Sequence, residues 1–170
     1  MSATECKGRR AVFRAEEEVL PNGHRMLVDK CIFPNAVAVL PVFSDGTALL
    51  IRQYRPVIGR YILEAPAGVI DPGETPEDAA RRELEEETGL QGGRLIRVGS
   101  AYTSPGYSTE KLYLYLVLDP EQGEASPEEH EIIEPMVFPL NDLVNMVLQG
   151  SIEDLKTVAL ILAAAQKIRP

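Results

Sequence analysis

Sulfur, imidazole and long apolar runs are all scarce in this sequence, and each shortage excludes a class of protein. The two cysteines, Cys6 and Cys31, lack the close spacing of zinc or redox motifs, and only two histidines are present. No segment approaches the roughly 18 consecutive apolar residues that a bilayer-spanning helix needs. The polar N-terminus also lacks the apolar core of a signal peptide. We therefore expect a cytoplasmic protein without a membrane span.

Positive charge is in deficit as well. The chain has 17 Lys and Arg against 26 Asp and Glu, which gives a net charge of −9 at pH 7. Binding to a nucleic-acid backbone requires a positively charged surface, so we expect no nucleic-acid partner. An anionic small substrate would meet the same repulsion unless bound divalent cations offset it locally.

The chain is long and apolar enough for one globular domain. It has 170 residues, 45% of them hydrophobic, and it contains no internal repeat or linker. Hydrophobic periodicity predicts strands over residues 11–20, 25–33, 36–43, 47–54, 61–63, 94–100, 111–118 and 133–139. It predicts helices over residues 75–88, 141–148 and 152–168, the last two capped by Asn141 and Ser151. This count of elements indicates a mixed α/β fold.

The remaining segments are predicted to be less regular. Turn-forming residues 21–24 indicate that the first two strands form a β-hairpin, and residues 44–46 join the next two strands in the same way. Residues 1–10 are expected to be frayed. The acidic, turn-rich residues 119–131 are expected to form a mobile loop.

The helix over residues 75–88 has a stop signal and a start signal. Thr75 can act as the N-cap, Pro76 suits the first helical position, and Gly89 suits a left-handed C-terminal residue. On this helix Glu83, Glu86 and Glu87 share one face, because they are three and four positions apart.

Three carboxylates on one face repel one another, which disfavours the helix. Two interpretations remain open from the glutamates alone: a solvated acidic surface, or a site for a hard divalent cation, which prefers carboxylate oxygens. The glycine-containing loop from Gly68 to Glu74 favours the metal site, because it can bring backbone carbonyls near the same ion.

The whole stretch, GVIDPGETPEDAARRELEEETGL over residues 68–90, resembles the Nudix hydrolase signature. Gly68, Glu74, the Arg82-Glu83 pair, Leu84, the Glu86-Glu87 pair and the Gly89-Leu90 pair all occupy its constrained positions. Such agreement is far more specific than a lone glycine motif. The resemblance implies a mixed sheet sandwiched between helices, with residues 35–170 as the core and residues 1–34 as an added N-terminal antiparallel hairpin.

Further positions resemble the Nudix enzymes that act on ADP-ribose. These positions are the proline of Ser104-Pro105-Gly106, residues 53–55, residues 64–68 and residues 154–157. In such relatives an N-terminal sheet usually takes part in dimerisation, so the resemblance implies a homodimer. It implies cleavage of ADP-ribose to AMP and ribose 5-phosphate.

The resemblance also implies roles for individual residues. Glu83, Glu86, Glu87 and the carbonyl of Ala67 would hold Mg²⁺ or Mn²⁺, as two or three ions. Arg82 would orient the glutamates. The substrate would contact Arg52, Arg55, Glu64, Ser104, Pro105 and Gly106. The general base would be Glu131, with Glu128 and Glu129 as neighbours that could replace it, or else Glu86 within the motif, while His130 is expected to be a solvated loop residue.

Alternatives remain for the substrate and for the function. The absence of tryptophan leaves Phe13, Tyr54, Tyr107 or an aliphatic wall to stack against adenine. GDP-mannose, another nucleoside diphosphate derivative or a dinucleotide are alternative substrates, and the Ser-Pro-Gly loop disfavours an oxidised nucleoside triphosphate. A non-catalytic nucleotide sensor would be expected to lose carboxylates of the motif, and this chain has kept all of them.

Overall fold

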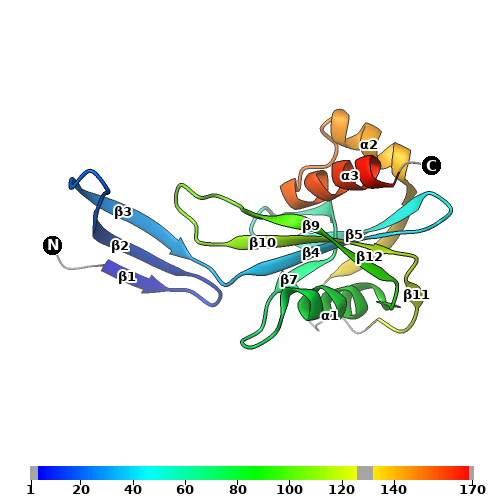
Figure 1. Cartoon of the computed structure of the whole chain (residues 1–170), viewed down its shortest axis with the longest axis horizontal. Helices are drawn as coiled ribbons and strands as arrows, with labels where there is room; N and C mark the ends of the chain where they lie inside the picture. The colour runs from blue at the N-terminus through cyan, green and yellow to red at the C-terminus, as the bar shows by residue number, and fades with distance from the viewer. Residues whose placement is uncertain (1–3, 126–131, 169–170) are drawn as a thin grey trace.

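The N-terminal segment forms a small antiparallel sheet that projects from the rest of the molecule (Figure 1). A computed structural model describes residues 4–125 and 132–168. Strand β2 (Val12–Val19) pairs with β3 (Arg25–Ile32), which confirms the predicted hairpin. The expectation of a frayed N-terminus is wrong over residues 4–7, because β1 (Thr4–Lys7) pairs with β2 and makes a third strand.

The core is a seven-stranded mixed sheet. Its main path has the order β12-β5-β4-β10-β9, with β6 added to β5 and β7 added to β4. Strands β4 (Ala36–Val42) and β10 (Lys111–Leu118) are parallel, and the other pairs are antiparallel. The remaining strands are β5 (Thr47–Arg55), β6 (Arg60–Glu64), β7 (Ala67–Val69), β9 (Arg94–Tyr102) and β12 (Ile133–Pro139).

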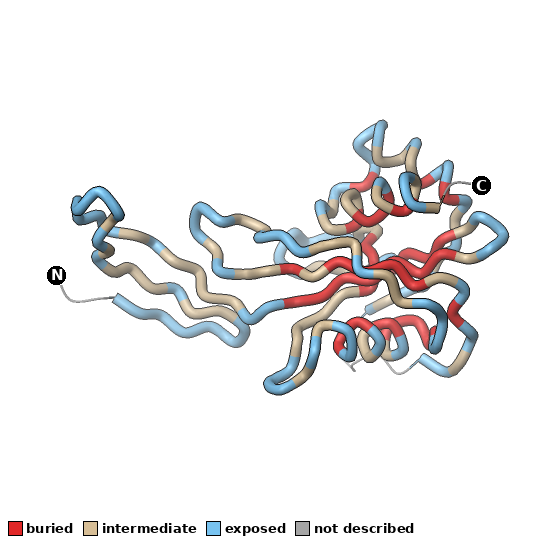
Figure 2. Tube along the Cα trace, viewed as in Figure 1, coloured by how far each residue is buried: buried red, intermediate tan, exposed pale blue. Residues whose placement is uncertain are grey.

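Helices cover both faces of this sheet. Helix α1 (Pro76–Thr88) lies on one face, and α2 (Leu140–Leu148) and α3 (Leu155–Lys167) lie on the other (Figure 1). Strand β4 is buried along its whole length, as Figure 2 shows, because its alternate side chains supply two separate hydrophobic clusters. Ala38 and Leu40 pack with α3, whereas Val37 and Val39 pack with α1. The predicted mixed sheet between helices is therefore confirmed.

The two central strands β4 and β5 diverge soon after their turn. They pair only at Val42 and Ala48, and beyond that point β5 pairs with β6 while β4 pairs with β7. The segment that joins β6 to β7 lies in this split, where Pro66 O accepts a hydrogen bond from Val39 N at 2.9 Å. Polar groups of the β6–β7 segment are thereby brought to the middle of the sheet.

The predicted caps of the last two helices are wrong. Helix α2 begins at Leu140 after Pro139 and has no side-chain cap, and α3 begins at Leu155 with Asp154 as its N-cap. Ser151 lies too far before α3 to cap it, and its backbone N–H donates to Met146 O at the end of α2, at 2.8 Å. In the expected mobile loop, the short strand β11 (Glu121–Gln122) pairs with β8 (Leu90–Gln91), which follows α1. Residues 126–131 lie outside the described residues.

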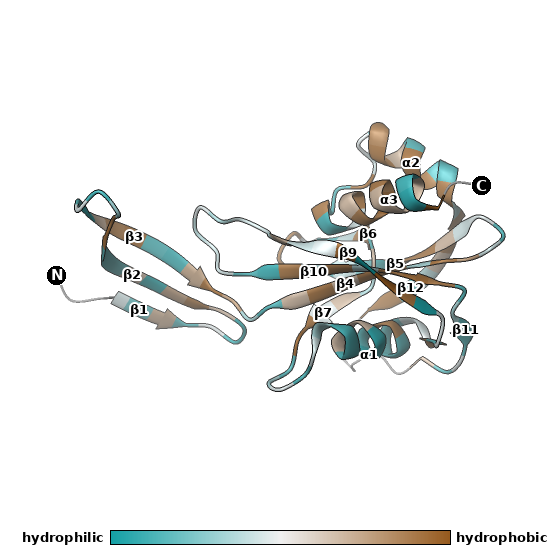
Figure 3. Ribbon diagram, viewed as in Figure 1, coloured by the Kyte–Doolittle hydropathy of each residue, from teal (hydrophilic) through white to brown (hydrophobic). Residues whose placement is uncertain are grey.

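Hydropathy follows these layers. Figure 3 shows hydrophobic residues concentrated on the central strands and much hydrophilic colour along α1. Among the described residues, none of the helices combines the length and the apolar character that crossing a bilayer would require.

Candidate functional site

Helix α1 has the caps that its sequence predicts. The Thr75 hydroxyl accepts a hydrogen bond from Asp78 N at 3.1 Å, and Pro76 occupies the first turn. Gly89 ends the helix with φ of 74°, a left-handed conformation that costs glycine little. Leu84 and Ala80 anchor the buried face against the sheet. The adjoining, glutamate-bearing side is thus held in a fixed orientation toward β7.

Arg82 is the centre of an ion-pair network beside the motif glutamates. Its Nε and Nη2 bond to the two carboxylate oxygens of Glu74 at 2.9 and 3.0 Å, and Nη2 also donates to Val69 O at 2.9 Å. Its Nη1 donates to Glu83 Oε1 at 2.7 Å and to Glu86 Oε2 at 3.0 Å. These contacts raise the pKa of Arg82, chiefly through Glu74. The guanidinium therefore offsets the repulsion between carboxylates and sets their positions.

The other glutamates are held by the backbone of β7. Glu87 is buried, and its Oε2 accepts a hydrogen bond from Ala67 N at 3.0 Å. Gly68 lies against the carboxylate of Glu83, so closely that a Cβ at this position would stand 2.0 Å from Glu83 Oε1. Only glycine leaves room for this carboxylate beside the strand.

These residues fit a divalent cation by the chemistry of their donors. Glu83, Glu86 and Glu87 offer hard carboxylate oxygens from one helix, next to the backbone of Ala67. Within the described part of the chain, no three acidic, histidine or cysteine side chains already converge as a metal cluster. The reason is visible in the contacts, because Arg82 holds Glu83 and Glu86 while Glu87 bonds to Ala67.

A second network lies at the split between β4 and β5. The buried carboxylate of Glu64 accepts two hydrogen bonds from Arg55, from Nε at 2.6 Å and from Nη2 at 2.8 Å. Lys156 of α3 also donates to Glu64 and lies 3.0 Å from Asp154. Burial raises the pKa of Glu64, but the bonds from Arg55 and the charge of Lys156 outweigh it and leave the pKa lowered.

Two adjoining cavities connect these networks. The first has a volume of about 510 Å³ and is bounded by the β9–β10 region and the start of α3, including Ser104 and Lys156. The second, of about 480 Å³, is bounded by Arg82, Glu83 and Glu86. Arg55, Ala67 and Gly68 line both cavities. A ligand with a charged centre and a less polar end could occupy both at once, and the volumes are in the range of small-molecule sites.

The structure brings together most, but not all, of the predicted site residues. Arg52 lies apart, in a third cavity of about 330 Å³, where it stacks 4.0 Å over the ring of Tyr61 and pairs with Glu134 at 3.3 Å. Pro105 and Gly106 do not line either of the two main cavities, although Ser104 lines the first. Glu131, with its neighbours Glu128, Glu129 and His130, lies outside the described residues.

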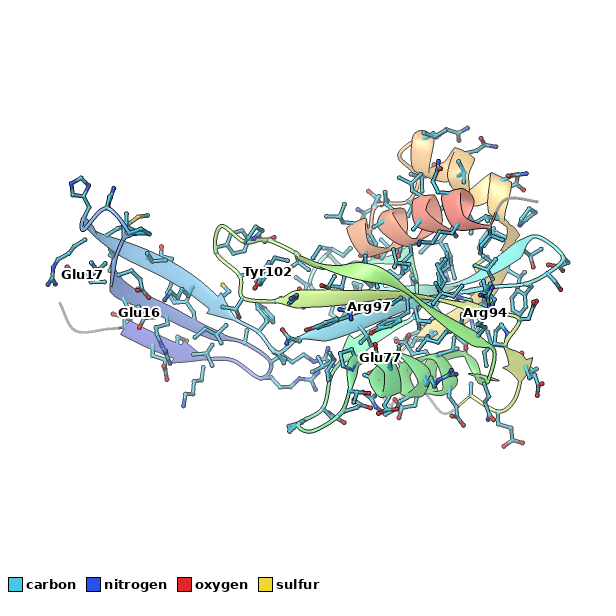
Figure 4. The ribbon with its side chains drawn as sticks, viewed as in Figure 1. Glu16, Glu17, Glu77, Arg94, Arg97 and Tyr102 are labelled. Atoms are coloured by element: carbon cyan, nitrogen blue, oxygen red, sulfur yellow. The ribbon has the colours of Figure 1, made fainter. Side chains whose placement is uncertain are left out.

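Several residues that line these cavities were not among the predicted site residues. Arg9 and Arg10, in the turn between β1 and β2, line the second cavity, and Arg10 also lines the first. Tyr102, the last residue of β9, is the single aromatic ring that lines either cavity among the described residues; Figure 4 labels it beside the β9–β10 loop. The predicted rings Phe13, Tyr54 and Tyr107 line neither cavity. The sequence signal that could have identified Tyr102 is its position two residues before Ser104, a predicted site residue.

Known proteins resemble this chain over most of its length. A model of the NUDIX domain family matches residues 32–161. An ADP-ribose pyrophosphatase of Bacillus subtilis (strain 168) is 37% identical over 144 residues, covering 84% of this chain and 78% of the relative. A GDP-mannose pyrophosphatase of Yersinia pestis (strain Pestoides F) is 38% identical over 127 residues, covering 69% of this chain and 64% of the relative. A crystal structure of an ADP compounds hydrolase is similar with a TM-score of 0.84 at 23% identity, covering 98% of this chain and 91% of that chain.

Proposed function

The chain belongs to the NUDIX domain family, and from this premise we propose that it hydrolyses the pyrophosphate bond of a nucleoside diphosphate sugar. The substrate that we favour is ADP-ribose, cleaved to AMP and ribose 5-phosphate. The observation that carries the proposal is the position of Arg55, which lines both the glutamate-bounded cavity and the larger one. The similar ADP-ribose pyrophosphatase supports this choice of substrate.

Divalent cations complete the site in this proposal. Members of the family generally use divalent metals, and here Glu83, Glu86, Glu87 and the carbonyl of Ala67 would hold Mg²⁺ or Mn²⁺, as two or three ions. When bound, these cations neutralise pyrophosphate charge and lower the pKa of coordinated water. Arg82 keeps the glutamates in place through its bonds to Glu74 and Val69.

Arg55 binds the diphosphate in this proposal. Two of its three nitrogens are used by Glu64, and among the described residues its Nη1 has no hydrogen-bond partner. Guanidinium groups suit phosphate oxygens because they are planar and always charged. The sugar or nucleoside end of the substrate would then lie in the larger cavity beside Ser104. Arg52 takes no part, because it faces a different cavity.

Glu131 remains our candidate for the general base, with Glu86 as the alternative inside the motif. We expect Glu131→Gln to lower kcat by roughly 10²–10⁴, the usual contribution of a general base, with little change in metal affinity. Steady-state kinetics and manganese titration measure the two quantities. An unchanged kcat would exclude Glu131 and leave Glu86, Glu128 and Glu129 as candidates, and Glu124→Gln, at an exposed residue earlier in the same loop, serves as the control.

A substrate panel tests the main proposal. The purified protein is incubated with Mg²⁺ and either ADP-ribose, GDP-mannose, NADH or FAD, and the products are separated by chromatography. We expect ADP-ribose to have the highest kcat/KM. A preference for GDP-mannose would favour the second candidate, which the similar GDP-mannose pyrophosphatase supports. Absence of hydrolysis of every diphosphate would leave a nucleotide-sensing domain.

The N-terminal sheet supports a homodimer. Phe13, Val19 and Leu27 lie on one face of this sheet, as their register requires, and they are 41%, 62% and 57% exposed. Large exposed apolar side chains on one sheet face, here beside the Glu17–Arg25 ion pair, favour an interaction surface, and a second copy of the chain is the partner that we propose. In the same proposal residues 1–170 are a single domain, with residues 35–170 as its core and residues 1–34 as its N-terminal extension. The protein works in the cytoplasm without a nucleic-acid or membrane partner.

A further inference from the structure

The contacts around Glu64 join the start of α3 to the phosphate-binding arginine. Each oxygen of the Glu64 carboxylate bonds to Arg55, and one of them also accepts the bond from Lys156. The side chain of Glu64 is 2% exposed, that of Lys156 is 14% exposed and that of Arg55 is 34% exposed. Glu64 is therefore the buried middle of the network; Arg55 lines both cavities, and Lys156 lines the larger one only.

Helix α3 holds Lys156 in a fixed place. Asp154 caps the helix by accepting a hydrogen bond from Thr157 N at 3.0 Å, and it also pairs with Lys156 at 3.0 Å. The hydroxyl of the buried Thr157 accepts a hydrogen bond from Ala65 N at 2.7 Å, which ties the helix to the segment after β6. The ammonium group of Lys156 is thus held by Asp154 and Glu64, at a helix end that Thr157 fixes to the segment after β6.

We propose that Lys156 is a positioning residue, which fixes the carboxylate of Glu64 so that Arg55 presents its free Nη1 edge to the diphosphate. The inference rests on the proposed function, since it takes Arg55 as the residue that binds this group.

A carboxylate that accepts bonds from Arg55 alone could rotate with the guanidinium. The additional bond from Lys156 to Oε2 of Glu64 keeps the carboxylate in one orientation. Charge gives the same result. Arg55 and Lys156 carry two positive charges, and Glu64 and Asp154 carry two negative charges. These four side chains together are therefore neutral before a ligand arrives. Removing Lys156 would leave an excess of negative charge beside the phosphate site.

The test is a double-mutant cycle between Lys156→Met and Arg55→Ala, with binding of ADP measured by calorimetry. We expect Lys156→Met to weaken ADP binding and to raise KM for ADP-ribose about tenfold, with a smaller change in kcat. In the Arg55→Ala background the same change should have little further effect. Lys156→Arg, which keeps the charge, should restore most of the affinity.

The control is Lys167→Met, which removes an exposed lysine from the other end of the same helix. Melting temperatures are compared for all variants, and Lys156→Gln replaces the methionine variant if that protein does not fold. Additive effects of the Lys156 and Arg55 changes would overturn the proposal, and so would unchanged ADP affinity in folded Lys156→Met. A wild-type protein that binds ADP through Arg55 but hydrolyses no diphosphate sugar would instead contradict the proposed function.

Discussion

At the scale of single residues, the glutamates of α1 depend on neighbours that carry no catalytic group. Gly68 makes room for Glu83, and Arg82 joins Glu74, Glu83 and Glu86 through one guanidinium. Like-charged side chains on one helix face would otherwise spread apart. The arrangement of the carboxylates is therefore a property of β7 and its loop as much as of the helix.

Gly68→Ala should displace Glu83 without unfolding the protein. The new methyl group would overlap the carboxylate at 2.0 Å, and a side chain of this length can rotate away. We expect kcat to fall about tenfold or more, because a displaced ligand weakens the metal site, while the melting temperature changes little. Gly99→Ala is the matched control, since a Cβ there meets no atom within 4 Å. Equal activity of the two variants would contradict this role for Gly68.

Tyr102 should contribute to affinity through its ring. It is 56% exposed and lines the larger cavity, where the base or sugar of the substrate would lie. Stacking of an aromatic ring on a base is worth about 1 kcal/mol or more, so Tyr102→Ala should raise KM for ADP-ribose about fivefold. Tyr102→Phe should keep most of the affinity. Tyr107→Ala removes an exposed ring outside the cavity, and an equal effect from it would rule out a specific contact of Tyr102.

At the scale of elements, β5 and β6 are joined by an ion pair around the buried Glu64, and an exposed pair of the same bidentate form joins β6 to the segment before α3. Arg55 donates two hydrogen bonds to the carboxylate of Glu64. Arg60 donates two to the carboxylate of Glu153 in the same bidentate way, at 2.6 and 2.9 Å. Only the first pair is buried. Removing one partner of a buried pair leaves an uncompensated charge, which is far more costly than the same change at the surface.

Glu64→Gln should therefore destabilise the fold by roughly 3–5 kcal/mol at neutral pH, whereas Glu153→Gln should change stability little. The pKa of Glu64 in the folded protein is below its ordinary value. Its stabilising effect is thus complete above about pH 4.3, the ordinary pKa of glutamate, and is lost as the pH falls below that. Urea unfolding at neutral and acidic pH measures this, and the gap between wild type and Glu64→Gln should narrow in acid. A constant gap would contradict the assignment.

At the scale of the whole molecule, the projecting N-terminal sheet is not covered by any other element of the chain that the structure describes. Its three strands share no helix or second sheet layer with the core in Figure 1, and its apolar side chains remain exposed. A sheet of this size is only marginally stable without something packed on a hydrophobic face. A second chain would supply that layer.

Leu27→Glu should weaken the homodimer that we propose, because it replaces an exposed apolar side chain of this face by a charge opposite Glu17. We expect light scattering after size-exclusion chromatography to show a monomer for this variant and a dimer for the wild type. Leu148→Glu, at a residue that is 76% exposed on α2, should remain dimeric. A dimeric Leu27→Glu protein would place the dimer contact elsewhere on the molecule. A monomeric wild type would contradict the homodimer itself.

The sequence by itself determined the fold class, the strands of the core other than β7, and helix α1 with both of its caps. These features depend on local periodicity and on residues such as Thr75, Pro76 and Gly89, whose conformational preferences act over a few positions. The motif also brought Glu83, Glu86 and Arg82 to attention, and the structure places all three at one cavity. Their catalytic and metal-binding roles stay predictions.

Only the tertiary structure decided which distant residues meet at that cavity. The divergence of β4 from β5 brings Glu64 beside Lys156, and the turn before β2 brings Arg10 to the same cavities. Arg52 and Arg55 face opposite sides of the sheet because they are three positions apart on one strand, and only the packing of the whole chain shows that the two main cavities lie on the Arg55 side. Such encounters depend on how strands pair across the chain, and no local pattern of residues encodes that pairing.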